Sequence, residues 1–492
     1  MRRNGMLLPI ASLPSPYGIG GFSKEAYEFI DLLEETGQKL WQILPLGPTS
    51  YGDSPYQSFS TFAGNPYFID LDTLAEKGWL TKEACEASDY GDNESYIDYG
   101  RIYNSRFVLL KQAFLNSDIL SDEKFTEFCK DNQHWLPDYA LYMALKNQND
   151  GKSWIEWEEE IRLRKPEAVE CYKRELEEEC NFYEFLQYEF HEQWTKVKEY
   201  AHKKGIQIVG DVPIYVAFDS ADTWANPELF QLDEKNLPLG VAGCPPDAFS
   251  ATGQLWGNPL YNWAYHKKTG YDWWLKRIAY CFDLYDIVRI DHFRGFDEYY
   301  SIPYGDETAV NGHWEKGPGM DLFNTVKEKL GELDIIAEDL GFLTESVFQL
   351  LKDSGYPGMK VLQFAFDPSE DSDYLTYKYQ RNCVVYTGTH DNDTTAGWFE
   401  KLSDGDKEVA LRYMNSFYTP KEEQHWDLIA LAMRSTADTC IIPVQDFLGL
   451  GSEARINMPS TLGDNWKWRM TKGAFSEELK EKIRRMTKLY GR

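Results

Sequence analysis

The 492-residue sequence lacks the patterns that identify several common classes of enzyme. It contains no GxSxG, no P-loop and no GxGxxG directly after a strand-like run, which disfavours serine hydrolases, nucleotide enzymes and Rossmann dehydrogenases. Its eight histidines are dispersed without an HxxxH pair, and no EF-hand-like loop is present, so zinc and calcium sites are not indicated. We therefore expect neither a metal nor a cofactor.

Paired cysteines and long apolar runs are also missing. None of the eight cysteines forms a CxxC pair, and Cys383 and Cys440 lie inside apolar runs, which is typical of reduced thiols in the cytoplasm. The apolar run at 6–10 is too short for a signal peptide, and no apolar stretch approaches 18 residues. These observations predict a cytoplasmic protein that does not span a membrane.

Positive charge is scarce. The chain has 51 Lys and Arg against 80 Asp and Glu, a net charge of −29, which repels phosphate backbones and anionic lipid. We therefore expect neither nucleic acid nor membrane as a partner, whereas a neutral substrate is compatible. Aromatic residues are abundant at 15%; most are expected in the core, and the surplus suits sugar rings, whose apolar faces lie flat on aromatic side chains.

Strand-like and helix-like segments alternate at the two ends of the chain. A helix is expected at about 24–36, and regular alternation resumes after about residue 205. Repeated strand–helix units predict a parallel sheet, either doubly wound or closed as a barrel. The expected strands are 41–46, 206–209, 287–290, 335–337, 361–366, 384–386 and 440–444.

Two segments interrupt this alternation. Residues 72–199 are rich in Glu, Lys and Tyr and lack β-branched runs, which predicts a mostly helical insertion. Residues 217–263 are studded with Pro, Gly and Trp and are interpreted either as a loop subdomain over a binding cleft or as a plain crossover. Because no linker and no internal repeat is present, we expect residues 1–492 to form one elaborated domain.

Three acidic residues each follow a strand-like run. They are Asp291 in Arg-Ile-Asp-His, Glu338 in Ala-Glu-Asp-Leu and Asp391 in Thr-His-Asp-Asn. Carboxylates at the ends of buried strands are costly unless a site needs them. A parallel barrel gathers such residues into one pocket at the carboxyl ends of its strands.

The neighbours of these acids suggest their chemistry. Arg289 lies two residues before Asp291, on the same side of the strand, and is expected to lower the pKa of Asp291; the pair is either a nucleophile with its positioning group or a structural ion pair. Apolar neighbours would keep Glu338 protonated, as a general acid requires. The side chain of Asp339 is expected to point away and cap the next helix.

The pair of His390 and Asp391 allows three interpretations: a clamp for sugar hydroxyls, a metal pair or a proton relay. Metal binding is disfavoured by the dispersed histidines. Two carboxylates on either side of a scissile bond describe a glycosidase-type site, and a third carboxylate would hold the distorted sugar ring.

The motifs as a whole resemble those of a known family over nearly the full length of the chain. They include Leu7-Leu8-Pro9-Ile10, Trp41-Gln42-Ile43-Leu44-Pro45, Gly52-Asp53-Ser54-Pro55-Tyr56-Gln57, Gly210-Asp211-Val212-Pro213, Gly253-Gln254-Leu255-Trp256-Gly257 and Arg455-Ile456-Asn457-Met458-Pro459. With the three acidic segments, they resemble the 4-α-glucanotransferases of the amylomaltase or disproportionating-enzyme type, glycoside hydrolase family 77 of the α-amylase clan.

The resemblance implies a (β/α)8 barrel without a C-terminal β-domain. It also implies that Asp291 is the nucleophile, Glu338 the general acid and base, and Asp391 the group that stabilises the transition state. Some relatives carry two adjacent aromatic residues after Pro246, but here Ala248 precedes Phe249, so Phe249 alone would serve as a stacking platform. The substrate-binding residues that the resemblance implies are Arg289, His390, Asp211, Tyr56, Gln254, Trp256, Phe249, Asp367 and Asn457.

The reaction that the resemblance implies is a retaining double displacement. A segment of α-1,4-glucan would pass from a maltodextrin donor, through a covalent glycosyl-enzyme, to the 4-hydroxyl of glucose or another glucan. The two reacting carboxyl groups are expected about 5–5.5 Å apart. An α-amylase-type hydrolase with the same acids and a carbohydrate-binding protein without catalysis are the alternatives.

Overall fold

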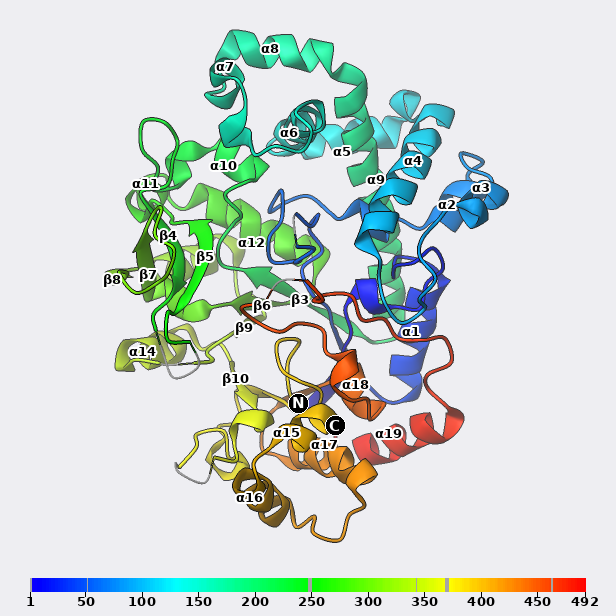
Figure 1. Ribbon diagram of the computed structural model, residues 1–492, viewed down its shortest axis with the longest axis vertical. Helices are drawn as coiled ribbons and strands as arrows, with labels where there is room; N and C mark the ends of the chain where they lie inside the picture. The colour runs from blue at the N-terminus through cyan, green and yellow to red at the C-terminus, as the bar shows by residue number, and fades with distance from the viewer. Residues whose placement is uncertain (1, 51, 247–249, 342, 368–370, 462) are drawn as a thin grey trace.

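The computed structural model describes residues 2–50, 52–246, 250–341, 343–367, 371–461 and 463–492. Its centre is a sheet of eight parallel strands whose order around the sheet follows their order along the chain (Figure 1). The first strand pairs with the last, and the remaining gap is bridged by a hydrogen bond from the Ala337 amide to the Pro357 carbonyl, at 2.9 Å. The strands are β1 (Arg3–Leu7), β2 (Leu40–Gln42), β3 (Gln207–Pro213), β6 (Ile287–Asp291), β9 (Ile335–Ala337), β10 (Gly358–Val361), β11 (Cys383–Tyr386) and β12 (Thr439–Pro443).

This arrangement is a (β/α)8 barrel, as the resemblance predicted, and it excludes a doubly wound sheet. Its interior is a packed core, because every strand contributes a buried apolar side chain to one cluster. These side chains are Leu7, Leu40, Val209, Ile287, Ile336, Met359, Val384 and Ile441.

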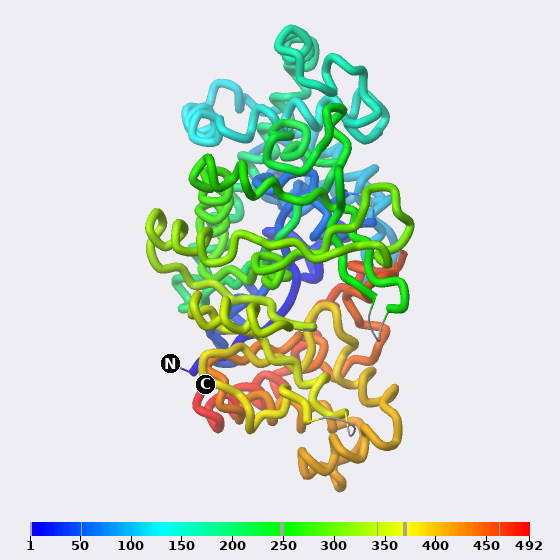
Figure 2. The backbone as a smooth tube through the Cα atoms, turned by 90° about the vertical axis from the view of Figure 1, so that its left-hand side faces the viewer, coloured from blue at the N-terminus to red at the C-terminus, as the bar shows by residue number. Residues whose placement is uncertain are grey.

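Helices cover the outside of the barrel. They include α1 (Lys24–Glu35), α12 (Asp272–Leu284), α13 (Met320–Leu330), α14 (Glu345–Ser354), α15 (Thr395–Lys401), α16 (Asp404–Met414), α17 (Gln424–Arg434), α18 (Val444–Phe447) and α19 (Glu477–Leu489). Both views show the two termini close together, where Arg492 donates a hydrogen bond to the carbonyl of Arg3 at 3.1 Å (Figures 1 and 2). No helix in the described part of the chain is long and apolar enough to cross a membrane.

The connection from β2 to β3 is a block of helices at one end of the molecule, at the top of Figure 1. Within it, α9 packs against α1 through the rings of Tyr200 and Tyr27, 5.1 Å apart, and runs directly into β3. The insertion boundaries at 72 and 199 stay a prediction. The block comprises α2 (Leu71–Glu76), α3 (Lys82–Ala87), α4 (Tyr99–Asn116), α5 (Glu123–Asp131), α6 (Leu136–Gln148), α7 (Glu159–Arg162), α8 (Pro166–Glu175) and α9 (Glu177–Lys203).

Some strand predictions were wrong. The first barrel strand, β1, was not predicted, because Arg-Asn-Gly at its start is unlike a buried strand; Gly5 is required there because the Leu40 carbonyl leaves no room for a Cβ atom. The strand expected at 361–366 ends at Val361, and a 3-10 turn (Leu362–Phe364) follows.

A second sheet, with four antiparallel strands, was also not predicted. It contains β4 (Gly240–Cys244), β5 (Gln254–Pro259), β7 (Glu298–Pro303) and β8 (His313–Lys316) in the order β5-β4-β7-β8. It lies at the left of Figure 1 and combines strands from before and after β6. The 217–263 segment therefore contributes strands to a structured unit that extends beyond it, together with α10 (Ala221–Ala225) and α11 (Trp263–Lys268).

Candidate active site

The polar residues predicted to form a site follow neighbouring barrel strands at their carboxyl ends. Asp211 lies on β3 opposite Arg289 of β6, and Asp291 ends β6. Glu338 follows β9 directly, and its amide donates a hydrogen bond of 3.0 Å to the Ile290 carbonyl of β6. Asp391 follows β11, two strands further around the barrel from β9. The fold therefore brings together residues that lie up to 180 positions apart in the sequence.

Arg289 is the centre of charge in this site. Its Nη1 lies 2.7 Å from both carboxylate oxygens of Asp211 and 3.0 Å from Oδ1 of Asp291. Arg289 and Asp211 are buried, whereas the Asp291 side chain is 30% exposed. The guanidinium therefore positions Asp291 from inside the barrel while one face of the carboxylate stays accessible.

Arg289 does lower the pKa of Asp291, as predicted, but the pKa is still raised above its ordinary value, contrary to prediction. Burial raises the pKa of Asp291 to about 6, and the charge of Arg289 opposes that rise without cancelling it. The charges of Asp211 and Asp391 add to the rise. Three carboxylates around one guanidinium leave an excess of negative charge, which the sequence pattern of β6 alone does not show.

The pKa of Glu338 is raised as well. Burial, and then the negative charge of Asp291, raise the pKa of Glu338 to about 7. Its Oε2 accepts a hydrogen bond from the His292 amide at 2.7 Å, and its Oε1 accepts one from the Leu340 amide at 2.9 Å. These two bonds fix the carboxyl group at the end of β9. The Arg289 guanidinium, 3.0 Å from Asp291, favours the ionised form of Asp291.

Asp391 is the most exposed of the three acids, with 41% of its side chain accessible. Burial raises its pKa, but His390, 3.4 Å away, and a 2.6 Å hydrogen bond from Asn457 outweigh it, so the net pKa lies far below its ordinary value. The pKa of His390 is raised in turn by Asp391, against the effect of burial. Asp391 is thus a persistent negative charge at the site.

Tyr56 connects the two halves of the site. Its hydroxyl donates to Asp211 at 3.0 Å and lies 2.9 Å from Nε2 of His390, so the imidazole N–H donates to the tyrosine oxygen. The two rings are stacked with centroids 5.2 Å apart. Burial keeps the pKa of Tyr56 well above its ordinary value, so the hydroxyl remains a donor.

Asp339 does not cap the next helix, contrary to prediction. Its buried carboxylate accepts a hydrogen bond from the Met359 amide at 2.6 Å, at the start of β10. The N-cap residue of α14 is Thr344. Asp339 therefore fastens β9 to β10, where strand pairing is weakest.

The strand β5 carries Gln254 and Trp256 to a position beside His292, the residue that follows Asp291. The Trp256 indole N–H donates to Gln254 at 3.0 Å, and its ring meets His292 edge to face with centroids 4.8 Å apart. Asp367 is exposed, three residues after the 3-10 turn that follows β10, and its part in glucan binding stays a prediction. Phe249 lies outside the described residues.

Sequence reasoning missed three positioning residues. His292 adopts a left-handed backbone conformation, with φ 51°, that turns its amide toward Glu338. Arg455 donates to the carbonyls of Asp391 at 2.6 Å and Asn457 at 2.7 Å. Asp446 is buried and accepts hydrogen bonds from Thr387 and Thr395, on either side of the His-Asp pair. Arg455 belongs to the quoted Arg-Ile-Asn-Met-Pro motif, whereas Asp446 has no local signal.

The described residues contain no group of three His, Cys, Asp or Glu arranged to hold a metal ion. The site itself supplies three carboxyl groups, those of Asp291, Glu338 and Asp391. A protonated carboxyl beside an ionised one, with a third permanent carboxylate, is the arrangement that retaining glycoside chemistry uses.

Comparison with known proteins identifies the family. The profile of glycoside hydrolase family 77, described as 4-alpha-glucanotransferase, matches residues 8–475. The chain belongs to this family. It is an enzyme of the 4-alpha-glucanotransferase class, as the resemblance predicted.

Individual relatives agree over the full length. The 4-alpha-glucanotransferase of Clostridium butyricum is 55% identical over 485 residues, covering 98% of this chain and 99% of that protein. The amylomaltase of Streptococcus agalactiae, solved in complex with acarbose, superposes with a TM-score of 0.97 at 43% identity, covering both chains completely. The amylomaltase of Corynebacterium glutamicum has a TM-score of 0.79 at 19% identity, covering 99% of this chain and 75% of that one, and shares the fold.

Proposed function

We propose that this family 77 enzyme transfers segments of α-1,4-glucan with Asp291 as nucleophile, Glu338 as general acid and base, and Asp391 as the stabiliser of the transition state. The observation that carries these roles is geometric: Asp291 and Glu338 lie at the ends of the adjacent strands β6 and β9, Arg289 lies 3.0 Å from Asp291, and two backbone amides hold the Glu338 carboxyl group. A nucleophile must be ionised while its partner still holds a proton. Burial and mutual repulsion raise the pKa of both acids, and the adjacent Arg289 charge favours the ionised form of Asp291.

In the first step, a carboxylate oxygen of Asp291 attacks the anomeric carbon of the donor as the bond to the leaving glucan breaks. Glu338 gives its proton to the oxygen of the leaving glucan, and the product is a covalent glycosyl-enzyme of inverted configuration. In the second step, the 4-hydroxyl of an acceptor attacks the same carbon. Glu338 takes the hydroxyl proton, Asp291 leaves, and the two inversions give net retention.

Asp391 acts on the positive charge that develops on the sugar ring between these bonds. Its low pKa keeps it ionised throughout the cycle, so its negative charge is present in both transition states. Asn457 and Arg455 hold it in place through its side chain and its backbone carbonyl. His390 and Tyr56, on the barrel side of Asp391, would offer hydrogen bonds to sugar hydroxyls.

The donor is a maltodextrin, and the acceptor is glucose or another glucan. The excess of carboxylates at the site suits a neutral substrate, whose hydroxyls donate hydrogen bonds to them. We also propose that the enzyme works in the cytoplasm. In support, Cys85, Cys129, Cys171, Cys180, Cys281, Cys383 and Cys440 are free thiols, as expected of a protein kept in a reducing compartment.

The distribution of products from maltotriose tests the proposal. Transfer gives glucose together with a ladder of longer maltodextrins, because the released segments are joined to new acceptors. Maltose and glucose alone would instead show that water completes the second step, as in an α-amylase-type hydrolase. A protein that binds maltotriose but releases no product would be a carbohydrate-binding protein without catalysis.

A further inference from the structure

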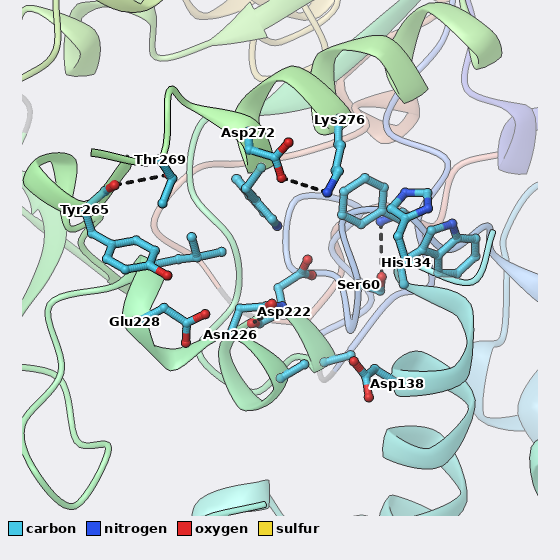
Figure 3. Close-up of a pocket in the computed structure, with 16 residues that line it drawn as sticks. Ser60, His134, Asp138, Asp222, Asn226, Glu228, Tyr265, Thr269, Asp272 and Lys276 are labelled. Atoms are coloured by element: carbon cyan, nitrogen blue, oxygen red, sulfur yellow. Dashed lines mark hydrogen bonds and ion pairs between the residues drawn. The ribbon is translucent and has the colours of Figure 1, made fainter. Parts of the chain in front are cut away.

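A cavity of about 180 Å³ lies outside the catalytic site, at the junction of the helical block with α10, α11 and α12 (Figure 3). We call it the α10 cavity. None of the residues assigned above to catalysis or glucan binding lines it. Its volume is smaller than the about 300–1,000 Å³ of sites for drug-sized ligands, which limits an occupant to about one ring.

Aromatic side chains from separate parts of the chain form much of the wall. Phe62 comes from the loop after β2, Trp135 from the start of α6, Tyr265 from α11 and Trp273 from α12. Phe62 lies near Trp135, with stacked rings 6.1 Å apart, and near Trp273, with rings edge to face at 6.3 Å. Phe62, Trp135 and Trp273 are buried and form an apolar base, and Tyr265, which is partly exposed, offers a ring face to an occupant of the cavity.

The acidic side chains in the wall differ in their partners. Asp138 is paired with Arg164 at 2.6 Å, and Asp272 is paired with Lys276 at 2.7 Å. Asp222 is 5% exposed and accepts a hydrogen bond from the Thr61 amide at 2.7 Å. Figure 3 shows it inside the ring formed by the other labelled residues.

Glu228 completes the acidic set at the exposed rim of the cavity. In the part of the chain that the structure describes, its carboxylate makes no ion pair. The wall thus offers carboxylate oxygens that can accept further hydrogen bonds.

The wall also contains donors. Lys276, Asn226, Thr269 and Ser60 line the same space. A wall that mixes donors and acceptors is poorly suited to a cation, because Lys276 would repel it.

We propose that the α10 cavity is a second, non-catalytic binding site for a single glucosyl unit at the end of an α-glucan. A pyranose has hydroxyls that both donate and accept, and an apolar face that rests on an aromatic ring, so it matches both parts of the wall. The choice of glucosyl unit rests on the proposed function, since α-glucan is the substrate of the enzyme.

The cavity is connected to the catalytic site through one short segment. Tyr56 contacts Asp211 and His390 in the site, while Ser60 and Phe62, a few residues later, line the cavity. Between them, the Thr61 amide donates to Asp222 in the cavity wall. A sugar bound in the cavity would therefore brace the segment that carries Tyr56.

Calorimetric titration with maltose tests the proposal, in a Glu338→Gln background that prevents turnover. The parent should bind maltose in the catalytic cleft and at one additional site. Ala225→Trp, which fills the cavity, should remove the additional site. Glu228→Ala, a milder change at the exposed rim, should raise the Kd of that site about fivefold, the effect of one hydrogen bond. Tyr418→Ala, which removes a fully exposed aromatic ring elsewhere, is the matched control and should bind as the parent does.

Three outcomes would overturn the proposal. In the first, the parent shows no maltose site beyond the cleft. In the second, the Ala225→Trp protein keeps the same number of maltose sites as the parent while its melting temperature is unchanged. In the third, spermidine, used as a cationic probe, competes for the additional site more strongly than maltose. If Ala225→Trp does not fold, the Glu228→Ala variant tests the proposal instead. An unchanged Kd of the additional maltose site in Glu228→Ala would then contradict the proposal. Transfer from maltotriose by the unsubstituted enzyme tests the proposed function separately. A failure of the cavity proposal can therefore be distinguished from a failure of the proposed function.

Discussion

The guanidinium of Arg289 lies 3.0 Å from the carboxylate of Asp291, two residues further along the same strand. The same guanidinium also binds both oxygens of Asp211 on the neighbouring strand, so one positive charge serves two carboxylates. This sharing weakens the hold of Arg289 on Asp291, which is consistent with the nucleophilic role that we propose for Asp291. A carboxylate paired alone with Arg289 would be stabilised more strongly, with a lower pKa and weaker nucleophilicity.

Replacing the proposed general acid should stop turnover without removing the substrate. Glu338→Gln keeps the shape of the side chain but has no proton to transfer, and we expect kcat to fall by at least about 10²–10⁴-fold. The affinity for maltotriose should stay within about threefold, as measured by calorimetry. Glu234→Gln, at an exposed turn, is the matched control and should behave as the parent does. Unchanged turnover in Glu338→Gln would remove Glu338 from the role of acid.

The pH dependence of kcat/KM should be bell-shaped and narrow. Activity requires ionised Asp291, so it should be lost as the pH falls through about 6, and it requires protonated Glu338, so it should be lost as the pH rises through about 7. The two limbs belong to the coupled pair, and initial rates of glucose release from maltotriose between pH 4 and 9 would define them. A rate that stays constant up to pH 9 would contradict the assignment of Glu338.

Removing the charge of Arg289 should move both limbs of this profile in the same direction. The Arg289 charge lowers the pKa of Asp291 and of Glu338, so Arg289→Gln should shift the acidic and the basic limb to higher pH. The variant should also lose about 3–5 kcal/mol of stability, because Asp211 is left buried and unpaired. Urea denaturation measures that loss. A profile that keeps its position would show that Arg289 does not set these pKa values.

The Tyr56 hydroxyl should contribute to substrate binding and should hold Asp211 and His390 in position. Tyr56→Phe removes the hydrogen bonds to Asp211 and His390 while keeping the stacked ring. The expected cost is about 1–2 kcal/mol, a roughly 5- to 30-fold loss in kcat/KM for maltotriose. Tyr377→Phe, whose hydroxyl binds Asp371 at an exposed turn, is the matched control. Equal kinetics in both variants would argue against a role for the Tyr56 hydroxyl.

Asp446 should act as a positioning residue for Asp391. Asp446→Asn removes one acceptor from the bonds to Thr387 and Thr395, and we expect a loss of about 1–3 kcal/mol in stability with a lower kcat. The exposed substitution Asp464→Asn is the control. A destabilised Asp446→Asn enzyme that keeps full kcat below its melting temperature would limit Asp446 to a structural role.

The strand pattern predicted a parallel sheet with three acids at strand ends because these signals are local, and the family resemblance then specified a barrel. Parallel strands buried on both faces are read as short apolar runs, and a carboxylate directly after such a run must lie at the carboxyl end of the sheet, as Asp291 and Glu338 do. β1 gave no such signal, because it contains Gly5 in place of an apolar residue. Gly5 is needed there because Leu40 of another strand approaches its backbone closely. The antiparallel sheet was missed for a related reason, since β4 pairs with β7 across the whole of α11, α12 and β6.

The sequence by itself determined which side chains could perform the chemistry, because residue type and position on a strand are properties of the chain. Tertiary structure alone decided their protonation: Asp291 has a raised pKa, against the expectation from Arg289, because burial and the charges of Asp211 and Asp391 act together on it. Desolvation and Coulomb interactions depend on distances between residues that are remote in sequence. For the same reason the helical block, α11 and α12 enclose a cavity whose aromatic and acidic wall no contiguous segment encodes.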